Sequence, residues 1–334
     1  MDVLILHDEV AADARPDELD TLVQVHAVAA ACEALGHRPR LGTVGLDLAA
    51  LAADLERARP DVVFQLVESV ARSGRLAHLP AHVLEHLGVP FTGGSAQTLF
   101  LTNSKLLTKV LLAQRGLPTP AWLSAEDLAR DRAIEAGPWL LKAVWEHGSL
   151  GIEADGVVSA RETTPLREAL ATRAASFGGE GFAERYVHGR EFNLALLEVD
   201  GAPRCLPVAE MRFERPDDGA PRVVGYKAKW DPASPDYWDT VRCFDFGPGD
   251  RELVERLRLQ ALGAWHALGL AGYARVDFRV GADDASWIID VNVNPCITPD
   301  AGFAATFARA GISYEAAVAH ILQAALRRAM VVAR

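Results

Sequence analysis

The stretch I-I-D-V-N-V-N-P, residues 288–295, gives the first indication of both the fold and the chemistry. Polar and aliphatic residues alternate along it until a proline breaks the pattern. Because alternate side chains of a β-strand lie on one face, Asp290, Asn292 and Asn294 are predicted to share a face. The aliphatic residues would pack on the other. The pattern therefore predicts a strand that presents one carboxylate and two carboxamides, whose oxygens suit a hard cation.

A second predicted strand supplies the neighbour of this one. The run Y-A-R-V-D-F-R-V, residues 273–280, precedes the turn sequence G-A-D-D, so the two strands are expected to form an antiparallel pair. That pair would bring Asp277 beside Asp290 and Asn292, a set of oxygens suited to Mg²⁺ with phosphate. Arg275 shares the face of Asp277 and would meet the same ligand. The sequence leaves open the alternative that the two aspartates are ordinary polar residues at strand ends.

Two lysines and a glycine loop point to a bound anion. Lys142 lies in the apolar run P-W-L-L-K-A-V-W, where an unpaired ammonium group is costly. The loop E-H-G-S-L-G follows directly, and such a loop exposes backbone N–H groups that can bind phosphate. It is not a Walker A loop, because the G-x-x-x-x-G-K-[ST] pattern is absent. Lys105, in T-N-S-K, is either a phosphate ligand or an exposed helix residue, and the sequence does not decide between these.

Composition restricts the class of protein. The chain has 334 residues and a formal net charge of −11. The length allows two or three domains, and the charge argues against nucleic acid or an anionic membrane as the main partner. No apolar stretch approaches the length of a membrane span. The start, MDVLILHDEV, lacks the basic segment of a signal peptide.

The cysteines and histidines offer little sign of a metal site. The sequence has 4 cysteines without Cys-x-x-Cys spacing, which favours reduced thiols over disulfides or zinc. We therefore expect a cytoplasmic α/β protein. His78, His82 and His86 follow at helical spacing, and an exposed helix face is favoured over a metal site. Cys296 is interpreted as structural or as lining a pocket, with a catalytic nucleophile as the alternative, because a reactive thiol needs a nearby base or cation.

The pattern of elements divides the chain into three parts. Alternating strands and helices up to about residue 95 predict βαβ units with a parallel sheet. Residues 96–190 begin with a helix and continue into strand-like segments. Residues 191–334 contain the two strands described above, a helix at 251–268 and a helical C-terminus. A polar loop is expected between about residues 212 and 240.

The order of these motifs resembles that of the ATP-grasp ligases, most closely their D-alanine–D-alanine ligase-like branch. The segments that carry the resemblance, in the order of the family, are V-P-F-T-G-G, T-N-S-K, L-L-K-A-V-W-E-H-G-S-L-G-I, A-E-R-Y-V-H-G-R-E-F, Y-K-A-K-W, Y-A-R-V-D-F and I-I-D-V-N-V-N-P. The resemblance implies an α/β ATP-grasp fold. Residues 1–95 would form an N-terminal parallel-sheet domain. Residues 96–190 and 191–334 would form two α+β subdomains that enclose ATP, the second of them with the Mg²⁺ and acyl-phosphate site.

The resemblance also implies a role for each site residue. The residues expected to bind ATP are Lys105 and Lys142 at the phosphates, Glu184 with the backbone of Arg185, Tyr186 and Val187 at the adenine, and Glu191 at the ribose hydroxyls. Ser149 would close over the phosphates, and Lys229 would reach the transferred phosphate from a mobile loop. Arg275 would stabilise the oxyanion, together with a backbone N–H near Cys296. The metal ligands would be Asp277, Asp290 and Asn292, holding two Mg²⁺ ions with Mn²⁺ as a substitute.

The implied reaction joins a carboxylate to an amine. The carboxylate would attack the γ-phosphate of ATP, and the amine would then attack the resulting acyl phosphate. The expected partners are small amino-acid-like carboxylates and amines, with neither nucleic acid nor a membrane. A homodimer is compatible with the family. The alternatives are a true D-alanine–D-alanine ligase with unusual substrate loops, or a catalytically silent nucleotide-binding protein.

The chain departs from the family at the substrate walls. The D-alanine–D-alanine ligases carry a Gly-Gly-x-Ser-x-Glu stretch after the first strand, and this chain has L-H-D-E-V-A-A-D-A there. Their H-G-x-x-G-E-D-G loop is replaced by V-E-S-V-A-R-S-G-R-L-A. Trp230 stands in place of a tyrosine, and Cys296 in place of a glycine. The serine that binds the acceptor carboxylate corresponds to Ala301, after Asp300. Asp300 either disfavours a carboxylate there or is the N-cap of a helix. We therefore expect D-alanine to be a poor acceptor.

Overall fold

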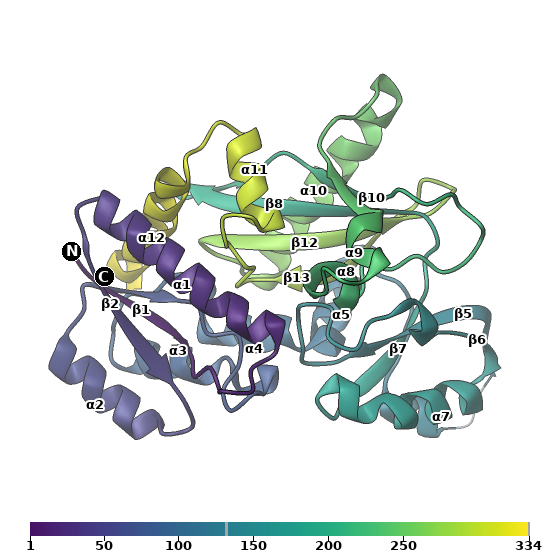
Figure 1. Cartoon of the computed structure of the whole chain (residues 1–334), viewed down its shortest axis with the longest axis horizontal. Helices are drawn as coiled ribbons and strands as arrows, with labels where there is room; N and C mark the ends of the chain where they lie inside the picture. The colour runs from purple at the N-terminus through teal and green to yellow at the C-terminus, as the bar shows by residue number, and fades with distance from the viewer. Residues whose placement is uncertain (131–132, 333–334) are drawn as a thin grey trace.

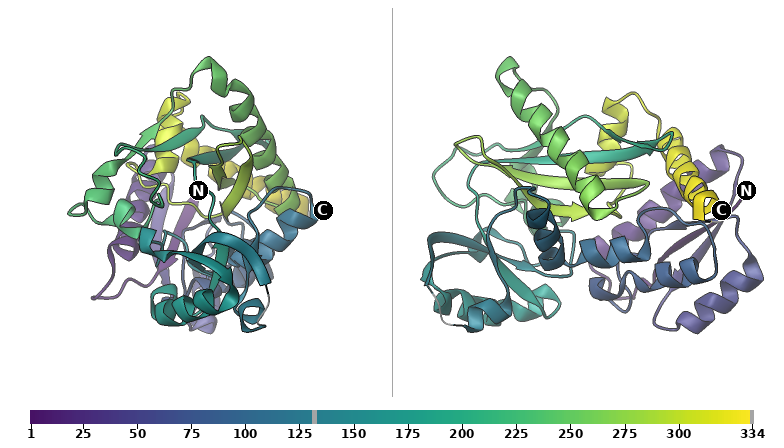
Figure 2. Two further views of the ribbon diagram at one scale, coloured as in Figure 1. Left: turned by 90° about the vertical axis from the view of Figure 1, so that its right-hand side faces the viewer. Right: turned by 180° about the vertical axis from the view of Figure 1, so that it is seen from behind.

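The structure is a computed structural model of the chain, and it describes residues 1–130 and 133–332. Three β-sheets form its framework, with the N-terminal and central sheets below the largest one in the view of Figure 1. Helices cover the outer faces, as the views from the side and from behind show (Figure 2). Among the described residues, no helix combines the length and apolar character needed to cross a bilayer.

The first sheet is parallel and has the strand order β2-β1-β3. Its strands are β1 (Asp2–Asp8), β2 (Arg38–Val44) and β3 (Val62–Gln65), and its helices are α1 (Pro16–Ala34), α2 (Leu48–Ala58) and α3 (Leu79–His86). The proline at the first position of α1 suits a helix start, where no N–H partner is needed. The βαβ arrangement expected for this part of the chain is confirmed. Helix α3 begins at Leu79, after a short 3₁₀ turn at Gly74–Leu76.

The second sheet is antiparallel, with the order β4-β7-β5-β6. Its strands are β4 (Trp122–Leu123), β5 (Ala133–Ala143), β6 (Val157–Glu162) and β7 (Gly181–Arg185), covered by α6 (Ala125–Ala129) and α7 (Thr163–Arg173). Two helices, α4 (Ala96–Asn103) and α5 (Lys105–Gln114), lead into it from the first sheet. Lys142 lies near the end of the buried part of β5, as the sequence indicated.

The third sheet has the order β11-β10-β8-β12-β13, and β9 adds to β8. Its strands are β8 (Arg190–Val199), β9 (Ala202–Cys205), β10 (Ala209–Phe213), β11 (Thr240–Cys243), β12 (Tyr273–Val280) and β13 (Ser286–Asn292). The loop expected at 212–240 contains two short helices, α8 (Tyr226–Trp230) and α9 (Pro235–Asp239). Helix α10 (Arg251–Leu268) packs on the sheet and ends at Gly269, whose φ of 65° suits glycine.

The cores show how the three sheets are held together. Buried residues of the second sheet form a cluster of their own, which includes Leu141 and Phe177. The first and third sheets instead share buried clusters, in one of which Val3 packs with residues of α12 (Tyr314–Val332) such as Val318. The C-terminal helix therefore returns to the N-terminal sheet, where it packs beside α1 and β3. The expected domain boundaries stay a prediction.

One expectation about the opening stretch is wrong. β13 ends at Asn292, so Asn294 does not continue the ligand face. Its side-chain Oδ1 accepts a hydrogen bond from the Tyr273 hydroxyl at 2.8 Å, and its Nδ2 donates to the backbone O of Val67 at 3.1 Å. The residue before a proline avoids helical geometry but need not stay in a sheet. Asn294 thus ties the third sheet to the first.

Candidate active site

A single cleft contains all of the residues predicted for the site. It holds about 760 Å³ of empty space, counting the part open to solvent, which falls within the range of small-molecule sites. The predicted residues that line it are Lys105, Lys142, Ser149, Glu184, Arg185, Tyr186, Val187, Glu191, Lys229, Arg275, Asp277, Asp290 and Asn292. They come from all parts of the chain after residue 100, so the fold brings together what the sequence separates. Their individual roles stay predictions.

The β12–β13 hairpin supplies the oxygen cluster. Asp277 lies directly opposite Asp290, and Arg275 lies opposite Asn292, as the alternating pattern predicted. Asn193, on β8, faces Asp277 from the other side and donates a hydrogen bond from Nδ2 to Oδ1 of Asp277 at 2.9 Å. The sequence analysis missed Asn193, because its register depends on the pairing of strands that are distant in sequence.

Arg275 is fixed in place by Asp277. Its Nε donates to Oδ1 of Asp277 at 2.8 Å, and its Nη2 donates to Oδ2 at 2.9 Å. Burial alone would lower the pKa of Arg275, but the carboxylates of Asp277 and Asp290 raise it above its ordinary value. Oδ1 of Asp277 accepts from both Arg275 and Asn193, whereas Oδ2 accepts from Arg275 alone. Because a carboxylate oxygen has two lone pairs, Oδ2 can hold the guanidinium and still ligate a cation.

The ionised form of Asp290 is favoured by two neighbouring side chains. Its Oδ1 lies 3.5 Å from Nζ of Lys105, and its Oδ2 lies 3.5 Å from Nδ1 of His147. Burial opposes ionisation, yet the charge of Lys105 and the contact with His147 hold the pKa of Asp290 well below its ordinary range. Lys105 is buried and also donates to the backbone O of Glu146 at 2.7 Å. The alternative that Lys105 is an exposed helix residue is therefore wrong.

Glu184 lies between two buried lysines. Its Oε1 accepts a hydrogen bond from Nζ of Lys142 at 3.1 Å, and its Oε2 lies 2.7 Å from Nζ of Lys109. Burial lowers the pKa of Lys109 to about 8, although Glu184 opposes this shift. The sequence analysis missed Lys109, which follows Lys105 by one helical turn. The carboxylate of Glu184 is engaged by ammonium groups, so the predicted adenine contacts fall mainly to the backbone that follows it.

That backbone segment is partly used within the protein. The N–H of Arg185 donates to the O of Ala121 at 2.8 Å, and the N–H of Tyr186 donates to the O of Pro138 at 3.1 Å. The Val187 N–H has no partner among the described residues. It is therefore the donor of this segment that remains available to a ligand.

Arg279 is a further cleft residue that the sequence analysis missed. It is 4% exposed, and it donates from Nη1 to Oε2 of Glu191 at 3.1 Å and from Nε to the O of Val187 at 3.0 Å. Arg279 therefore links the predicted adenine segment to the predicted ribose ligand. The alternation R-x-D-x-R at 275–279 was a signal for it, because Arg279 shares the face of Asp277.

The glycine loop and α8 together cover the cleft. Gly148 and Ser149 have φ values of 67° and 64°, a conformation that turns successive N–H groups toward one side. The Ser149 hydroxyl donates to the O of Val224 at 2.8 Å, and Nε1 of Trp230 donates to the O of Gly148 at 3.1 Å. Residues 146–152 and 224–230 thus form one covering layer, which we call the lid. The Ser149 hydroxyl is occupied, so its contact with phosphate would come from its backbone.

Lys229 is the cation that the lid brings to the cleft. Lys229 lies on α8, and its ammonium group forms no hydrogen bond or ion pair with the described residues. Burial lowers the pKa of Lys229 and the nearby Arg275 lowers it further, while Asp277 and other carboxylates oppose this shift. A phosphoryl group would supply the missing counter-charge.

Cys296 is structural in this arrangement. Its Sγ donates to Oδ2 of Asp20 at 3.0 Å, and the Thr298 hydroxyl donates to the same oxygen at 3.0 Å. Burial, with the charges of Asp20 and Glu68, raises the pKa of the Cys296 thiol. A thiol that stays protonated is a poor nucleophile, which supports the structural interpretation.

The histidines of α3 also have a structural explanation. The ring of His78 packs against Phe100 with centroids 5.0 Å apart and against His82 at 5.5 Å. Within the described ranges, no group of three or more His, Cys, Asp or Glu residues is placed to hold a metal ion. The ring contacts of His78 and His82 give these two side chains a packing role.

An acidic group lies beside the cleft at the end of the first sheet. The carboxylate of Asp8 accepts hydrogen bonds from the backbone N of Glu68 at 2.7 Å and of Ser69 at 2.8 Å. Solvent reaches the side chain of Glu68, but the lost hydration and the charges of Asp8, Asp20 and Asp17 raise the pKa of Glu68 to about 8. Asp8 and Glu68 lie in the two segments where the sequence departs from the family that it resembles.

Helix α11 (Gly302–Arg309) follows the segment that contains Cys296. Its N-cap is Ala301, whose side chain cannot cap the helix. The alternative that Asp300 is the N-cap is therefore wrong. Arg242, on β11, lies against Gly302. Arg242 gave no signal in the sequence, because it is one of many arginines and its neighbours in space are distant along the chain.

Comparison with known proteins gives consistent matches over most of the chain. The sequence profile described as "D-ala D-ala ligase C-terminus" matches residues 111–323. A D-alanine–D-alanine ligase of Methylococcus capsulatus is 32% identical over 283 residues, covering 84% of this chain and 82% of that protein. One from Synechococcus is 29% identical over 314 residues, covering 92% and 90%. The crystal structure of D-alanine–D-alanine ligase from Bacillus anthracis complexed with ATP has a TM-score of 0.71, with 20% identity and 99% of each chain covered, which supports the fold.

Proposed function

Because this chain belongs to the D-alanine–D-alanine ligase family of ATP-grasp enzymes, we propose that its cleft joins a small amino-acid-like carboxylate to a small amine. Members of the family are ADP-forming carbon–nitrogen ligases, so the chain is an ATP-dependent carboxylate–amine ligase. The observation that supports the proposed site is the convergence of cations, carboxylates and a glycine loop on one cleft.

The nucleotide would lie between the second and third sheets. Lys105 and Lys142 would neutralise its phosphates, and the lid would exclude water above them. The Val187 N–H and the neighbouring backbone carbonyls would bind the adenine, and Glu191, positioned by Arg279, would accept hydrogen bonds from the ribose hydroxyls. The roles of Arg185 and Tyr186 would be to shape this slot.

The cation site would be formed by Asp277, Asp290 and Asn292. Family membership implies Mg²⁺ in general, and the donor set fits it, because the low pKa of Asp290 keeps that ligand charged. Mg²⁺ bound here neutralises the charge that develops on the phosphate oxygens. We infer two such ions, with Mn²⁺ able to replace them.

The residues of the cleft would act in two steps. In the first, an oxygen of the substrate carboxylate bonds to the γ-phosphorus as the bond to ADP breaks, and Lys229 and the Ser149 backbone hold the moving phosphoryl group. In the second, the amine nitrogen bonds to the acyl carbon to form a tetrahedral oxyanion, and the C–O bond to phosphate then breaks while the nitrogen gives up a proton to the departing phosphate. Arg275, held rigid by Asp277, would stabilise the oxyanion between these events.

The organisation of the chain follows from this assignment. We propose residues 1–95 as the N-terminal domain, 96–190 as the central subdomain and 191–334 as the C-terminal subdomain with the cation site. A homodimer and a cytoplasmic location stay predictions. Light scattering of the purified chain would decide the oligomeric state.

A screen of substrate pairs tests the function. Purified protein, ATP and Mg²⁺ are incubated with amino acids as carboxylates, either with hydroxylamine or with a second amino acid, and phosphate and hydroxamate are measured. We expect ATP consumption that depends on the carboxylate, and hydroxamate formation, because hydroxylamine captures an acyl phosphate. Efficient turnover with D-alanine alone would identify a true D-alanine–D-alanine ligase. The absence of hydroxamate with every carboxylate would contradict the proposal.

A further inference from the structure

Arg242 lies on the same face of the third sheet as the ligand residues. β11 pairs with β10 so that Arg242 is opposite Met211, and Met211 is opposite Glu191 on β8. Residues directly paired in an antiparallel sheet project to the same face. The side chain of Arg242 therefore projects to the face that carries Glu191, and that face also carries Arg275 and Asp277 on β12.

Gly302 makes room for the guanidinium group of Arg242. A Cβ atom on Gly302 would lie 3.1 Å from Nη2 and 3.4 Å from Nε of Arg242, closer than side chains normally pack. The φ of Gly302 is not positive, so this glycine is needed for space and not for its backbone conformation. The guanidinium group therefore rests against the first residue of α11.

The positive charge of the Arg242 guanidinium group is only partly offset by neighbouring side chains. The side chain of Arg242 forms no hydrogen bond or ion pair within the part of the chain that the structure describes. Burial lowers the pKa of Arg242 and Arg275 lowers it further, while only Asp300 opposes this shift. Ala301 provides no side-chain cap, so the first N–H groups of α11 are also left without side-chain partners.

We propose that Arg242 binds a carboxylate of the amine substrate, so that the second substrate is an α-amino acid or another amine with an anionic group. A guanidinium group matches a carboxylate in shape and charge. The inference rests on the proposed ligase function and specifies the class of its acceptor. The sequence analysis instead expected D-alanine, which carries a carboxylate, to be a poor acceptor, because it placed Asp300 but not Arg242 at this helix start.

The arrangement also explains the loss of the serine. The family resemblance implies that other members bind the acceptor carboxylate with a serine hydroxyl at the position of Ala301. Here Ala301 and Gly302 carry no hydroxyl, and the space beside them is filled by Arg242. The guanidinium group of Arg242 would take the place of the serine hydroxyl, so that a charged donor replaces a neutral one. The carboxylate of the amine substrate would then lie closer to β11.

The test compares amino acids with their carboxamides as the second substrate. D-Alanine, L-alanine, glycine and the carboxamide of each are supplied to the wild type and to Arg242→Gln, with each carboxylate that forms a hydroxamate. We expect Arg242→Gln to raise the KM for the amino acids by about 10- to 100-fold, as for the loss of a charged hydrogen bond. The KM for the carboxamides and for ATP should not change. Arg242→Lys should retain part of the effect.

Two further variants make the test specific. Arg212→Gln is the matched control, because Arg212 on the adjacent strand pairs with Val241 and so lies on the opposite face. It should leave every KM unchanged. Gly302→Ala should raise the KM for amino acids alone, because its Cβ would displace the guanidinium group while Arg242 itself is retained.

The outcomes separate this inference from the function on which it rests. Hydroxamate formation uses no acceptor carboxylate, so equal rates in the wild type and Arg242→Gln, with the expected rise in KM, support the inference. Equal rates with unchanged KM values for amino acids would overturn it and leave the ligase function intact. A wild-type preference for carboxamides would also overturn it. No hydroxamate with any carboxylate would overturn both.

Discussion

Asp290 is the side chain on which the cation site depends most, because it remains ionised while Asp277 is shared with Arg275. Replacing Asp290 with Asn removes one negative charge from the site. We expect turnover to fall by roughly 10²-fold, about 2.7 kcal/mol of transition-state stabilisation, and the Mg²⁺ concentration for half-maximal rate to rise. Steady-state assays over a range of Mg²⁺ concentrations measure both effects.

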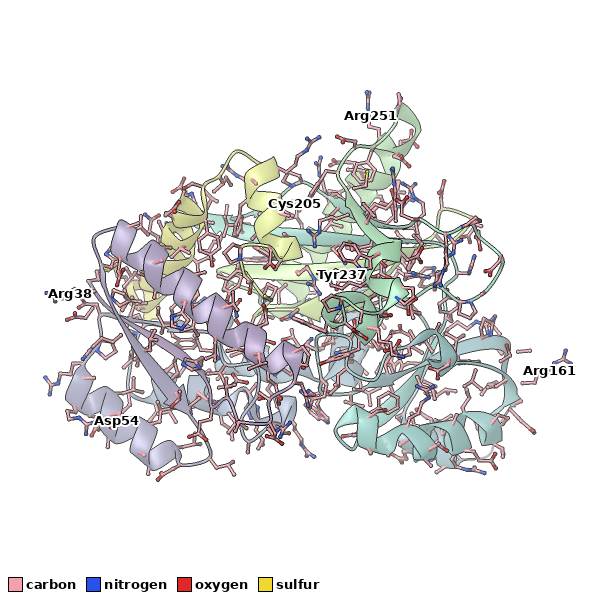
Figure 3. The ribbon with its side chains drawn as sticks, viewed as in Figure 1. Arg38, Asp54, Arg161, Cys205, Tyr237 and Arg251 are labelled. Atoms are coloured by element: carbon pink, nitrogen blue, oxygen red, sulfur yellow. The ribbon has the colours of Figure 1, made fainter. Side chains whose placement is uncertain are left out.

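The fold of this variant should persist, because Lys105 keeps its hydrogen bond to the O of Glu146. Asp54→Asn is the matched control, since Asp54 lies on α2 at the far surface of the first sheet (Figure 3). Near-normal turnover and Mg²⁺ dependence of Asp290→Asn would show that Asp290 is not a ligand.

Glu68 should make stability depend on pH. Its pKa is raised from 4.5 to about 8 in the folded protein, so the folded state binds this proton more tightly than the unfolded state. That contribution to stability is complete below pH 4.5 and is lost as the pH rises to 8. Glu68→Gln removes the titration. The Tm of the variant relative to the wild type should therefore be higher at pH 9 than at pH 5.

Thermal unfolding at pH 5, 7 and 9 and constant ionic strength measures this difference. The exposed Glu252 at the start of α10 provides the control variant, Glu252→Gln. A Tm difference between Glu68→Gln and the wild type that does not vary with pH would contradict the assignment.

Some residues of the candidate site could be placed from the sequence alone, and others could not. The roles proposed for Arg275, Asp277 and Asp290 follow from a hairpin whose register is local, so alternation and one turn were enough to place them together. Asn193 and Arg242 lie on strands whose pairing is set by the tertiary fold. No short-range pattern marks them, and only the assembled sheet shows that they share the face of Arg275 and Asp277.

At the scale of elements, α5 and β5 meet at the buried carboxylate of Glu184. Lys142 and Lys109 both contact Glu184, but only Lys142 lines the cleft. Removing either charge leaves the other lysine to pair with the carboxylate. We therefore expect Lys142→Met and Lys109→Met to lower the free energy of unfolding by similar amounts, below the roughly 3–5 kcal/mol for a buried pair left with one unpartnered charge.

Only Lys142→Met should weaken ATP binding, by about tenfold or more, because it alone removes a charge that faces the phosphates. Calorimetric titration with ATP and Mg²⁺ measures the affinities, and denaturant unfolding measures the stabilities. Equal ATP affinities of the two variants would place the phosphates away from Lys142.

Elements with a strong local pattern were predicted well. Strand β12 and helix α10 have the ranges expected from alternation and helical spacing. The helices α8 and α9 were not predicted, since each is shorter than two turns; α8 is held by contacts with the glycine loop, and α9 packs against α8. An isolated helix of that length is not stable in water, and its sequence reads as a polar loop.

At the scale of the whole molecule, the lid connects all three sheets. Residues 224–230 bind the glycine loop, and the Tyr226 hydroxyl donates to Oδ1 of Asp17 on α1 at 2.7 Å. A ligand beneath the lid should hold it closed. At 100 times the Kd, bound ATP contributes about 2.7 kcal/mol. Amide exchange that requires opening of the cleft should therefore slow by about 100-fold.

Hydrogen–deuterium exchange with and without ATP and Mg²⁺ tests this expectation. Slower exchange is expected in residues 146–152 and 224–230, and EDTA should reverse part of the effect. Helix α2 lies on the first sheet away from the cleft and should not respond. Unchanged exchange in the lid at saturating ATP would contradict its proposed role.

The return of α12 to the first sheet determines when that sheet can be completed during synthesis. β1 leaves the ribosome well before α12, because the rest of the fold lies between them in the sequence. Val3 and Ile5 are buried in the same cluster as Val318 and Ile321, so the nascent chain exposes aliphatic strands until α12 has been made. Domains usually fold as they emerge. Here the second sheet, with its separate core, can fold first, and the N-terminal sheet must wait for the C-terminal helix.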